Sequence, residues 1–202
     1  MSSDVNSVAA ARVAGKATRK ERRLLWLLAV VPIVFLLGLG GYALLIRTST
    51  PSTPKPPPLR AGMEAPAFTY SDLEGKAVSL KDFRGKVVFL NVWATWCPTC
   101  TWEMPSMEAI YRKYRDQGLV MLGVSIDVLG KDIVAPYMKK YRLTFPALLD
   151  PKGTIKRMYQ TTGVPETFIV DRDGRIFRKI IGPREWTEPQ MVRMIEAALS
   201  SS

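Results

Sequence analysis

The stretch NVWATWCPTC, residues 91–100, contains the only two cysteines of a 202-residue chain that has no histidine. Cys97 and Cys100 are separated by two residues and follow a run of apolar side chains. Three kinds of site use such a pair: a structural disulfide, half of a metal site, or a dithiol that cycles with its disulfide. The rest of the sequence distinguishes these alternatives.

Residue counts exclude most of the metal and haem interpretations. A structural zinc site usually takes four Cys or His ligands, and this chain supplies two cysteines. Covalent haem attachment needs a histidine directly after the second cysteine, where the chain has Thr101. A bridge across so short a loop removes little entropy from the unfolded chain, so it would be a weak structural staple. A redox-active pair remains, and it requires no metal and no cofactor other than the disulfide itself.

The positive charge of the chain is concentrated at its N-terminus. The formal net charge is +11, yet residues 61–202 carry 20 basic against 16 acidic side chains. Residues 1–23 carry six basic side chains against two acidic ones, and they precede an uncharged stretch, LLWLLAVVPIVFLLGLGGYALLI, at residues 24–46. At a rise of about 1.5 Å per residue, this stretch is long enough for a hydrocarbon core of about 30 Å. We therefore predict a membrane protein and no binding of nucleic acid.

Residues 24–46 are predicted to form a single uncleaved transmembrane helix. A cleaved signal peptide has an apolar region of about 7 to 15 residues and a small-x-small cleavage site, and neither condition is met here. Six basic residues before the span, against Arg47 directly after it, predict that residues 1–23 form a cytoplasmic tail. Everything after the span is then on the other side of the membrane.

A proline-rich spacer at residues 47–60 precedes a predicted globular domain at residues 61–202. The spacer RTSTPSTPKPPPLR has five prolines, which favour an extended chain. In the domain, strand patterns alternate with helix patterns, which indicates an α/β fold. Strands are expected at residues 67–70, 77–80, 87–94, 119–126, 146–150 and within 167–181, and helices at 97–117, 132–141, 154–160 and, after a Thr187–Gln190 capping box, up to residue 199.

The expected helix at residues 97–117 starts at the cysteine pair. Free N–H groups and the helix dipole stabilise a thiolate at a helix N-terminus and lower the pKa of its thiol. Cys97 is therefore the candidate nucleophile. Cys100, one helical turn further on, can resolve a mixed disulfide that Cys97 forms with a substrate.

The sequence around the pair resembles a known family. FLNVWATWCPTC, followed by Glu103, Pro105, GVSID and the stretch GVPETF at residues 163–168, resembles the thioredoxin superfamily over about residues 61–200. More narrowly, it is similar to the membrane-anchored periplasmic reductases of the TlpA, ResA and CcmG type. The resemblance implies a thioredoxin-like fold, in which a central mixed β-sheet is flanked by helices and extended by an N-terminal β-hairpin.

The same resemblance implies a function, a location and partners. It implies a protein-disulfide reductase in a bacterial cytoplasmic membrane, with its catalytic domain in the periplasm. A dithiol that works among oxidants must be kept reduced, which in this family is done by a CcdA- or DsbD-like membrane donor. The expected clients are apocytochromes c, during cytochrome c maturation, or copper-site proteins.

The resemblance also implies roles for single residues. Pro165 matches a cis-proline that faces the disulfide, where Val164 would offer backbone groups to an extended client. Asn91 replaces the buried Asp of thioredoxin, and because an amide cannot take up a proton, Glu103 is expected to exchange protons with Cys100. We expect Glu103 to be exposed or half-exposed. The remaining residues expected to contact clients are Trp96, Pro98, Thr99 and Glu166.

Two other functions stay open. A thiol-dependent peroxidase of the AhpC/TSA (peroxiredoxin) type shares this fold, but it would have a threonine three residues before its cysteine, where this chain has Ala94. A non-catalytic adaptor would use the same groove only to bind clients. A copper chaperone of the Sco type needs a histidine ligand, which the chain lacks.

Overall fold

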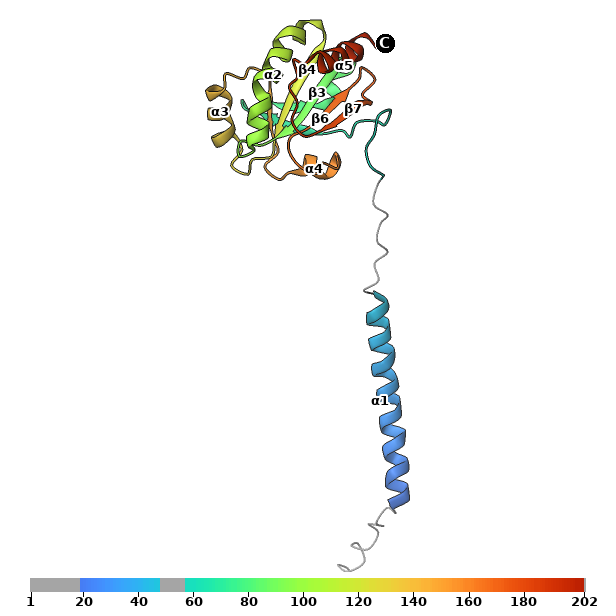
Figure 1. Ribbon diagram of the computed structural model, residues 1–202. Helices are drawn as coiled ribbons and strands as arrows, with labels where there is room; N and C mark the ends of the chain where they lie inside the picture. The colour runs from blue at the N-terminus through green and yellow to red at the C-terminus, as the bar shows by residue number, and fades with distance from the viewer. Residues whose placement is uncertain (1–18, 48–56, 202) are drawn as a thin grey trace, which may run out of the picture. The chain divides into compact units, whose positions relative to one another are not determined.

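The computed structural model describes residues 19–47 and 57–201, in two compact units divided after Pro56 (Figure 1). In the first unit α1, Arg19–Arg47, is a 29-residue helix that contains Pro32. Within the described part of the chain, no helix combines the length and the apolarity needed to cross a membrane. The transmembrane segment at residues 24–46 therefore stays a prediction. Residues 1–18 of the expected tail at residues 1–23, and residues 48–56 of the spacer, lie outside the described residues, whereas residues 19–23 of that tail belong to α1.

The second unit is built on a seven-stranded mixed sheet with the strand order β2-β1-β5-β4-β3-β6-β7. Its parallel pairs are β3–β4 and β4–β5, and the other neighbours are antiparallel. The strands are β1 Thr69–Asp72, β2 Ala77–Ser79, β3 Val87–Trp93, β4 Leu119–Ser125, β5 Ala147–Leu149, β6 Glu166–Val170 and β7 Ile176–Ile181. The predicted mixed sheet and its alternation with helices are confirmed.

β3 lies in the interior of the sheet, between β4 and β6, where every one of its side chains is apolar or hydrogen-bonded. All seven residues of VVFLNVW are buried. Val88 and Leu90 point to one face, and Phe89 and Trp93 point to the other. A strand buried on both faces gives the continuous apolar run seen in the sequence. The N-terminal hairpin β1–β2 extends the sheet, since β1 pairs with β5.

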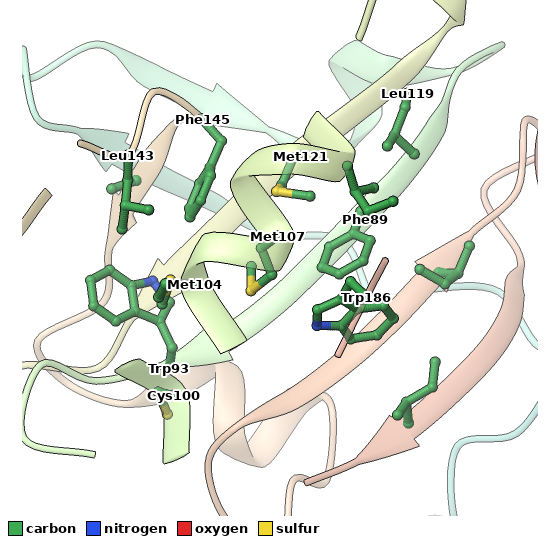
Figure 2. Packing of buried hydrophobic residues seen from close by; sticks show 14 of the residues in the cluster. Phe89, Trp93, Cys100, Met104, Met107, Leu119, Met121, Leu143, Phe145 and Trp186 are labelled. Carbon is green, nitrogen blue, oxygen red and sulfur yellow. The ribbon is translucent and has the colours of Figure 1, made fainter. Parts of the chain in front are cut away.

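Helices cover both faces of the sheet. One face packs against α2 (Pro98–Tyr114), α3 (Lys131–Lys140) and α5 (Pro189–Ser200), and the other packs against α4 (Thr154–Met158) and the segment before β1. Figure 2 shows Met104 and Met107 of α2 pointing into the first core, where Phe89 and Trp186 also lie. The rings of Phe89 and Trp186 meet edge to face at 4.6 Å between centroids. This packing fixes the start of α2 against the end of β3.

Several element boundaries differ from the expectation: β1 starts at Thr69 instead of residue 67, α3 lies one residue earlier than predicted, and α4 ends at Met158 instead of residue 160. The helix predicted to run to residue 117 ends as α2 at Tyr114 and continues as a 3₁₀ turn that stops at Gly118, whose φ of 98° suits glycine. The predicted capping box at Thr187 is wrong. α5 starts one residue later, with Glu188 as its N-cap and Pro189 in its first turn, and the Thr187 hydroxyl donates to the Glu185 carboxylate instead.

Candidate active site

The two cysteines form a disulfide at the N-terminus of α2. Cys97 is the N-cap residue, and Pro98 takes the first helical position, where the missing N–H of proline costs nothing. The backbone N–H of Cys100 donates to Cys97 Sγ at 3.2 Å. A thiolate on Cys97 would therefore be stabilised by the free donors of the helix, as the sequence predicts.

Access to the two sulfurs is unequal. Cys97 is 4% exposed, and Cys100 is completely buried. Figure 2 shows Cys100 below Trp93 and Met104 at the edge of the apolar core. Because only Cys97 reaches the surface, a substrate can meet this sulfur first, and Cys100 can act only from inside the protein.

The loop before β6 faces the disulfide. The Val164–Pro165 peptide bond is cis, as expected from the GVPETF stretch. Cys97 Sγ lies 3.6 Å from the carbonyl oxygen of Val164. The Pro165 carbonyl accepts a bond from the backbone N–H of Gly182, which ties the loop to the end of β7. Pro165 itself is buried, whereas Val164 is half-buried.

Three residues that were expected to contact clients lie on the surface around Cys97. Trp96 is 65% exposed, and both Pro98 and Thr99 are exposed. The Thr99 hydroxyl lies 3.3 Å from Cys97 Sγ. Trp93, by contrast, is fully buried. The structure thus gathers these residues around one sulfur.

Glu103 is not at the surface, which corrects the expectation of an exposed or half-exposed side chain. It is 0% exposed. Its Oε1 accepts from Asn91 Nδ2 at 2.9 Å. Its Oε2 accepts from Trp186 Nε1 at 3.1 Å and from the backbone N–H of Arg184 at 3.2 Å. Trp186 lies 83 residues after Glu103 in the chain, and its side chain contacts the carboxylate directly.

Burial raises the pKa of Glu103 to about 7, although the hydrogen bonds from Trp186, Asn91 and Arg184 oppose this effect. Asn91 is also buried, and its Nδ2 donates to Thr167 Oγ1 at 2.9 Å. The carboxyl group is therefore surrounded by groups that hold it in place but do not take up its proton. With a pKa near neutrality, Glu103 can both accept and release a proton under the conditions in which the enzyme works.

Glu166 does not contact clients, contrary to the expectation, because its side chain is 0% exposed. Its Oε1 forms an ion pair with Lys179 Nζ at 2.7 Å. Its Oε2 accepts from the backbone N–H of Thr162 at 3.0 Å. The side chain therefore fixes the loop that carries Val164, and it does not itself face a client.

The sequence analysis did not include Asp127 among the site residues. This carboxylate is 3% exposed and accepts from the backbone N–H of Thr95, two residues before Cys97, at 2.9 Å. A signal for it was present, since Asp127 lies two residues after the end of the second buried strand, β4, which runs parallel to β3. Parallel strands end at the same edge of a sheet, so a polar residue after β4 falls beside the residues that follow β3. Trp186 gave no such signal, because it lies in an irregular segment.

No metal site accompanies the disulfide in the described part of the chain, where no group of three or more His, Cys, Asp or Glu side chains could hold an ion. The chemistry that these residues support is thiol–disulfide exchange through the Cys97–Cys100 pair.

Sequence comparisons place this geometry among known enzymes. Residues 61–179 match the AhpC/TSA family. The thiol-disulfide oxidoreductase ResA of Bacillus thuringiensis subsp. konkukian is 39% identical over 173 residues, which cover 85% of this chain and 94% of that protein. ResA of Bacillus subtilis strain 168 is 35% identical over 121 residues, which cover 60% of this chain and 67% of that protein.

Comparison with solved structures identifies the fold. A putative thiol:disulfide interchange protein DsbE from Chlorobium tepidum superposes with a TM-score of 0.66 and 31% identity, covering 70% of this chain and 99% of that one. StoA from Bacillus subtilis superposes with a TM-score of 0.55 and 27% identity, covering 65% of this chain and 97% of that one. The fold around the disulfide is thus thioredoxin-like.

Proposed function

Because the chain belongs to the AhpC/TSA family and is a thiol-disulfide oxidoreductase related to ResA, we propose that it reduces protein disulfides outside the cytoplasm while anchored in the membrane. The observation that carries the proposal is the unequal access of the two cysteines, with Cys97 4% exposed beside the Val164 carbonyl and Cys100 completely buried behind it. This arrangement suits a reaction in two steps on one client.

In the first step the Cys97 thiolate attacks one sulfur of the client disulfide. The client S–S bond breaks, its second sulfur leaves as a thiolate, and a mixed disulfide joins the client to Cys97. The extended client segment would pair with the backbone at Val164, which lies against Cys97 Sγ.

In the second step Cys100 loses its proton and attacks Cys97 Sγ. The bond to the client breaks, and the client's first sulfur leaves as a thiolate. Both client thiolates take up protons, so the client has gained two electrons and two protons and the Cys97–Cys100 disulfide has formed. Glu103, one helical turn after Cys100, is the group we assign to accept the Cys100 proton, because its pKa lies close to neutrality.

The anchor belongs to the proposal too. The described side chains of α1 include large apolar groups that are exposed, such as Trp26, Phe35 and Leu37. An apolar segment flanked by six basic residues on its N-terminal side supports insertion with residues 1–23 in the cytoplasm. The catalytic domain would then lie in the periplasm of a bacterium, held near the cytoplasmic membrane by the proline-rich spacer.

The location defines the partners that we propose. A reductase among oxidants needs a membrane donor of the CcdA or DsbD type, which would return two electrons to the Cys97–Cys100 disulfide. Its clients would be proteins whose cysteines must be reduced before they bind a cofactor, such as apocytochromes c or copper-site proteins. The chain itself lacks the histidine ligand that a copper chaperone of the Sco type needs.

Trapping of clients tests the proposal. In full-length Cys100→Ser, the mixed disulfide on Cys97 cannot be resolved, so we expect covalent client adducts that dithiothreitol releases. Cys97→Ser is the matched control and should form none. Mass spectrometry of the released proteins would identify the clients.

Three results would contradict the proposal. If Cys100→Ser forms no adducts although circular dichroism shows a native fold, Cys97 is not a nucleophile toward proteins. If the Cys97→Ser/Cys100→Ser double variant retains the same clients without a covalent bond, the protein is an adaptor. If the wild type consumes hydroperoxide in the presence of a thiol but does not reduce protein disulfides, it is a peroxidase.

A further inference from the structure

Asp127 is a buried carboxylate that holds the segment leading into the nucleophile. Its Oδ2 accepts from the backbone N–H of Thr95 at 2.9 Å, and its Oδ1 accepts from the Thr95 hydroxyl at 2.7 Å. The Ser125 hydroxyl donates to Oδ2 at 2.8 Å. Two strand ends, those of β3 and β4, are thereby joined through a single side chain.

The hydrogen bonds of Asp127 hold residues that lead directly into Cys97. The backbone N–H of Cys97 donates to the carbonyl oxygen of Ala94 at 3.2 Å, so residues 94–97 form a tight turn. Thr95 lies inside that turn and is fixed by Asp127 at both its N–H and its hydroxyl. The orientation of the turn, and with it the position of Cys97 Sγ at the start of α2, depends on Asp127.

The charge of Asp127 is not compensated by a cation. Among residues 57–201, no Lys or Arg nitrogen forms an ion pair with Asp127. Burial of a carboxylate with only neutral donors costs more stability than burial of an amide of the same shape. A negative charge near the turn also opposes the helix N-terminus, which would stabilise a thiolate on Cys97.

We propose that Asp127 is a positioning residue that fixes the Thr95–Cys97 turn and, through its negative charge, disfavours the Cys97 thiolate and so keeps the Cys97–Cys100 pair strongly reducing. This inference rests on the proposed function, which requires the pair to give electrons to clients. A reductase gains from a less stable dithiol, because the reduced form then transfers its electrons more readily.

Other titratable groups pack around the same turn. Tyr137 of α3 donates from its hydroxyl to Thr101 Oγ1 at 2.8 Å, and its ring packs on Trp93. Burial raises the pKa of Tyr137, so it stays neutral near pH 7. Glu103 of α2 lies on the inner side, in its own hydrogen-bond network with Asn91. The equilibrium with dithiothreitol is therefore compared at the same pH in all variants.

The test replaces Asp127 with Asn in the full-length chain and measures the equilibrium of the cysteine pair with dithiothreitol. We expect the equilibrium to shift toward the dithiol by about three- to tenfold, the effect of one charge at a partly buried site. The alkylation profile of Cys97 should move to lower pH by about 0.5 to 1 unit, for the same reason.

Asp150→Asn is the matched control. Asp150 directly follows β5, is 2% exposed, and accepts from the Thr154 hydroxyl at 2.9 Å and from the Ile155 N–H at 2.7 Å. Its donors belong to α4, on the opposite face of the sheet from α2. Its stability should change in the same direction and by an amount comparable with Asp127→Asn, but its equilibrium with dithiothreitol should stay within about twofold of wild type.

The outcomes separate the inference from the proposed function. Equal shifts in both variants, or no shift in either, overturn the role of Asp127 while the reductase remains. A wild-type pair that never exchanges with dithiothreitol overturns the proposed function itself. If Asp127→Asn does not fold, Ser125→Ala serves instead. It removes one neutralising donor but keeps the charge, so the equilibrium should move toward the disulfide, and a shift toward the dithiol would contradict the inference.

Discussion

Charged side chains near the disulfide are held in the interior by hydrogen bonds. Glu103 receives three donors, from Asn91, Arg184 and Trp186. Such donors lower the cost of burying a carboxylate, but they do not remove it, and the remaining cost appears as a raised pKa. A group in this state links the protonation of the site to the stability of the fold.

Substitution of Glu103 by Gln should change the pH dependence of stability. The folded-state pKa of Glu103, about 7, exceeds its unfolded value of 4.5. The protonated form is therefore favoured by folding, and its stabilising contribution is complete below about pH 4.5 and is lost as the pH rises through 7. Between pH 5 and pH 8, wild type should lose roughly 2 to 3 kcal/mol relative to Glu103→Gln, measured by urea denaturation.

Glu108→Gln is a control on the same helix with the opposite sign. Burial alone would raise the pKa of Glu108, but hydrogen bonds from Thr144 and Arg112 hold it below its ordinary value. Its contribution is present above the unfolded pKa and is lost as the pH falls, so Glu108→Gln should cost stability at pH 8 and little at pH 3. Parallel curves for Glu103→Gln and wild type would show that Glu103 is not titrating near neutrality.

At the level of secondary structure elements, the loop at residues 160–164 is held between two strands. Glu166, the first residue of β6, accepts from the backbone N–H of Thr162, and Lys179 of β7 donates to the carbonyl oxygen of Gln160 at 3.3 Å. Because Glu166 and Lys179 also pair with each other, one buried ion pair holds the loop that brings Val164 to Cys97 at two points, Gln160 and Thr162.

Lys179→Met should therefore destabilise the domain by about 2 to 4 kcal/mol, because it leaves the Glu166 carboxylate buried without its cation. The Glu166→Gln/Lys179→Met double variant should recover part of this loss. Chemical denaturation measures both values. Arg178→Met, at the exposed neighbouring position of β7, is the control and should stay within about 0.5 kcal/mol of wild type. Equal losses of stability in Lys179→Met and Arg178→Met would mean that the ion pair does not stabilise the domain.

Across the whole molecule, the elements that carry their own pattern were predictable. β3 and β4 are continuous apolar runs, the cysteine pair stands at a helix start, and the Val164–Pro165 bond is cis as the GVPETF stretch implies. These features depend on residues close together in the chain.

Features that depend on distant segments could not be predicted in the same way. The burial of Glu103 requires Arg184 and Trp186, about 80 residues later, to fold over α2. The helix position of Glu103 by itself suggests an exposed side chain. Likewise, Glu166 follows the cis-proline and so seemed to face clients, but strand alternation turns it to the opposite face from Thr167 and toward Lys179.

Membrane topology is a property of the whole chain, and gene fusions test it. Alkaline phosphatase joined after residue 60 should be active, since residues 47–202 are proposed to lie in the periplasm. A fusion within residues 1–23 should be inactive, and N-terminal sequencing should find those residues still attached to the mature protein. An inactive fusion after residue 60, or a mature chain that starts beyond Ile46, would contradict the anchor or its orientation.

The unequal exposure of the two sulfurs also protects the enzyme from oxidative damage. A hydroperoxide that reaches the site meets Cys97 and converts its thiolate to a sulfenic acid. Cys100, close enough to form the disulfide, can attack that sulfenic acid and release water before further oxidation to the irreversible sulfinic acid. The product is the same disulfide that client reduction would leave, so the membrane donor proposed above would also repair this lesion.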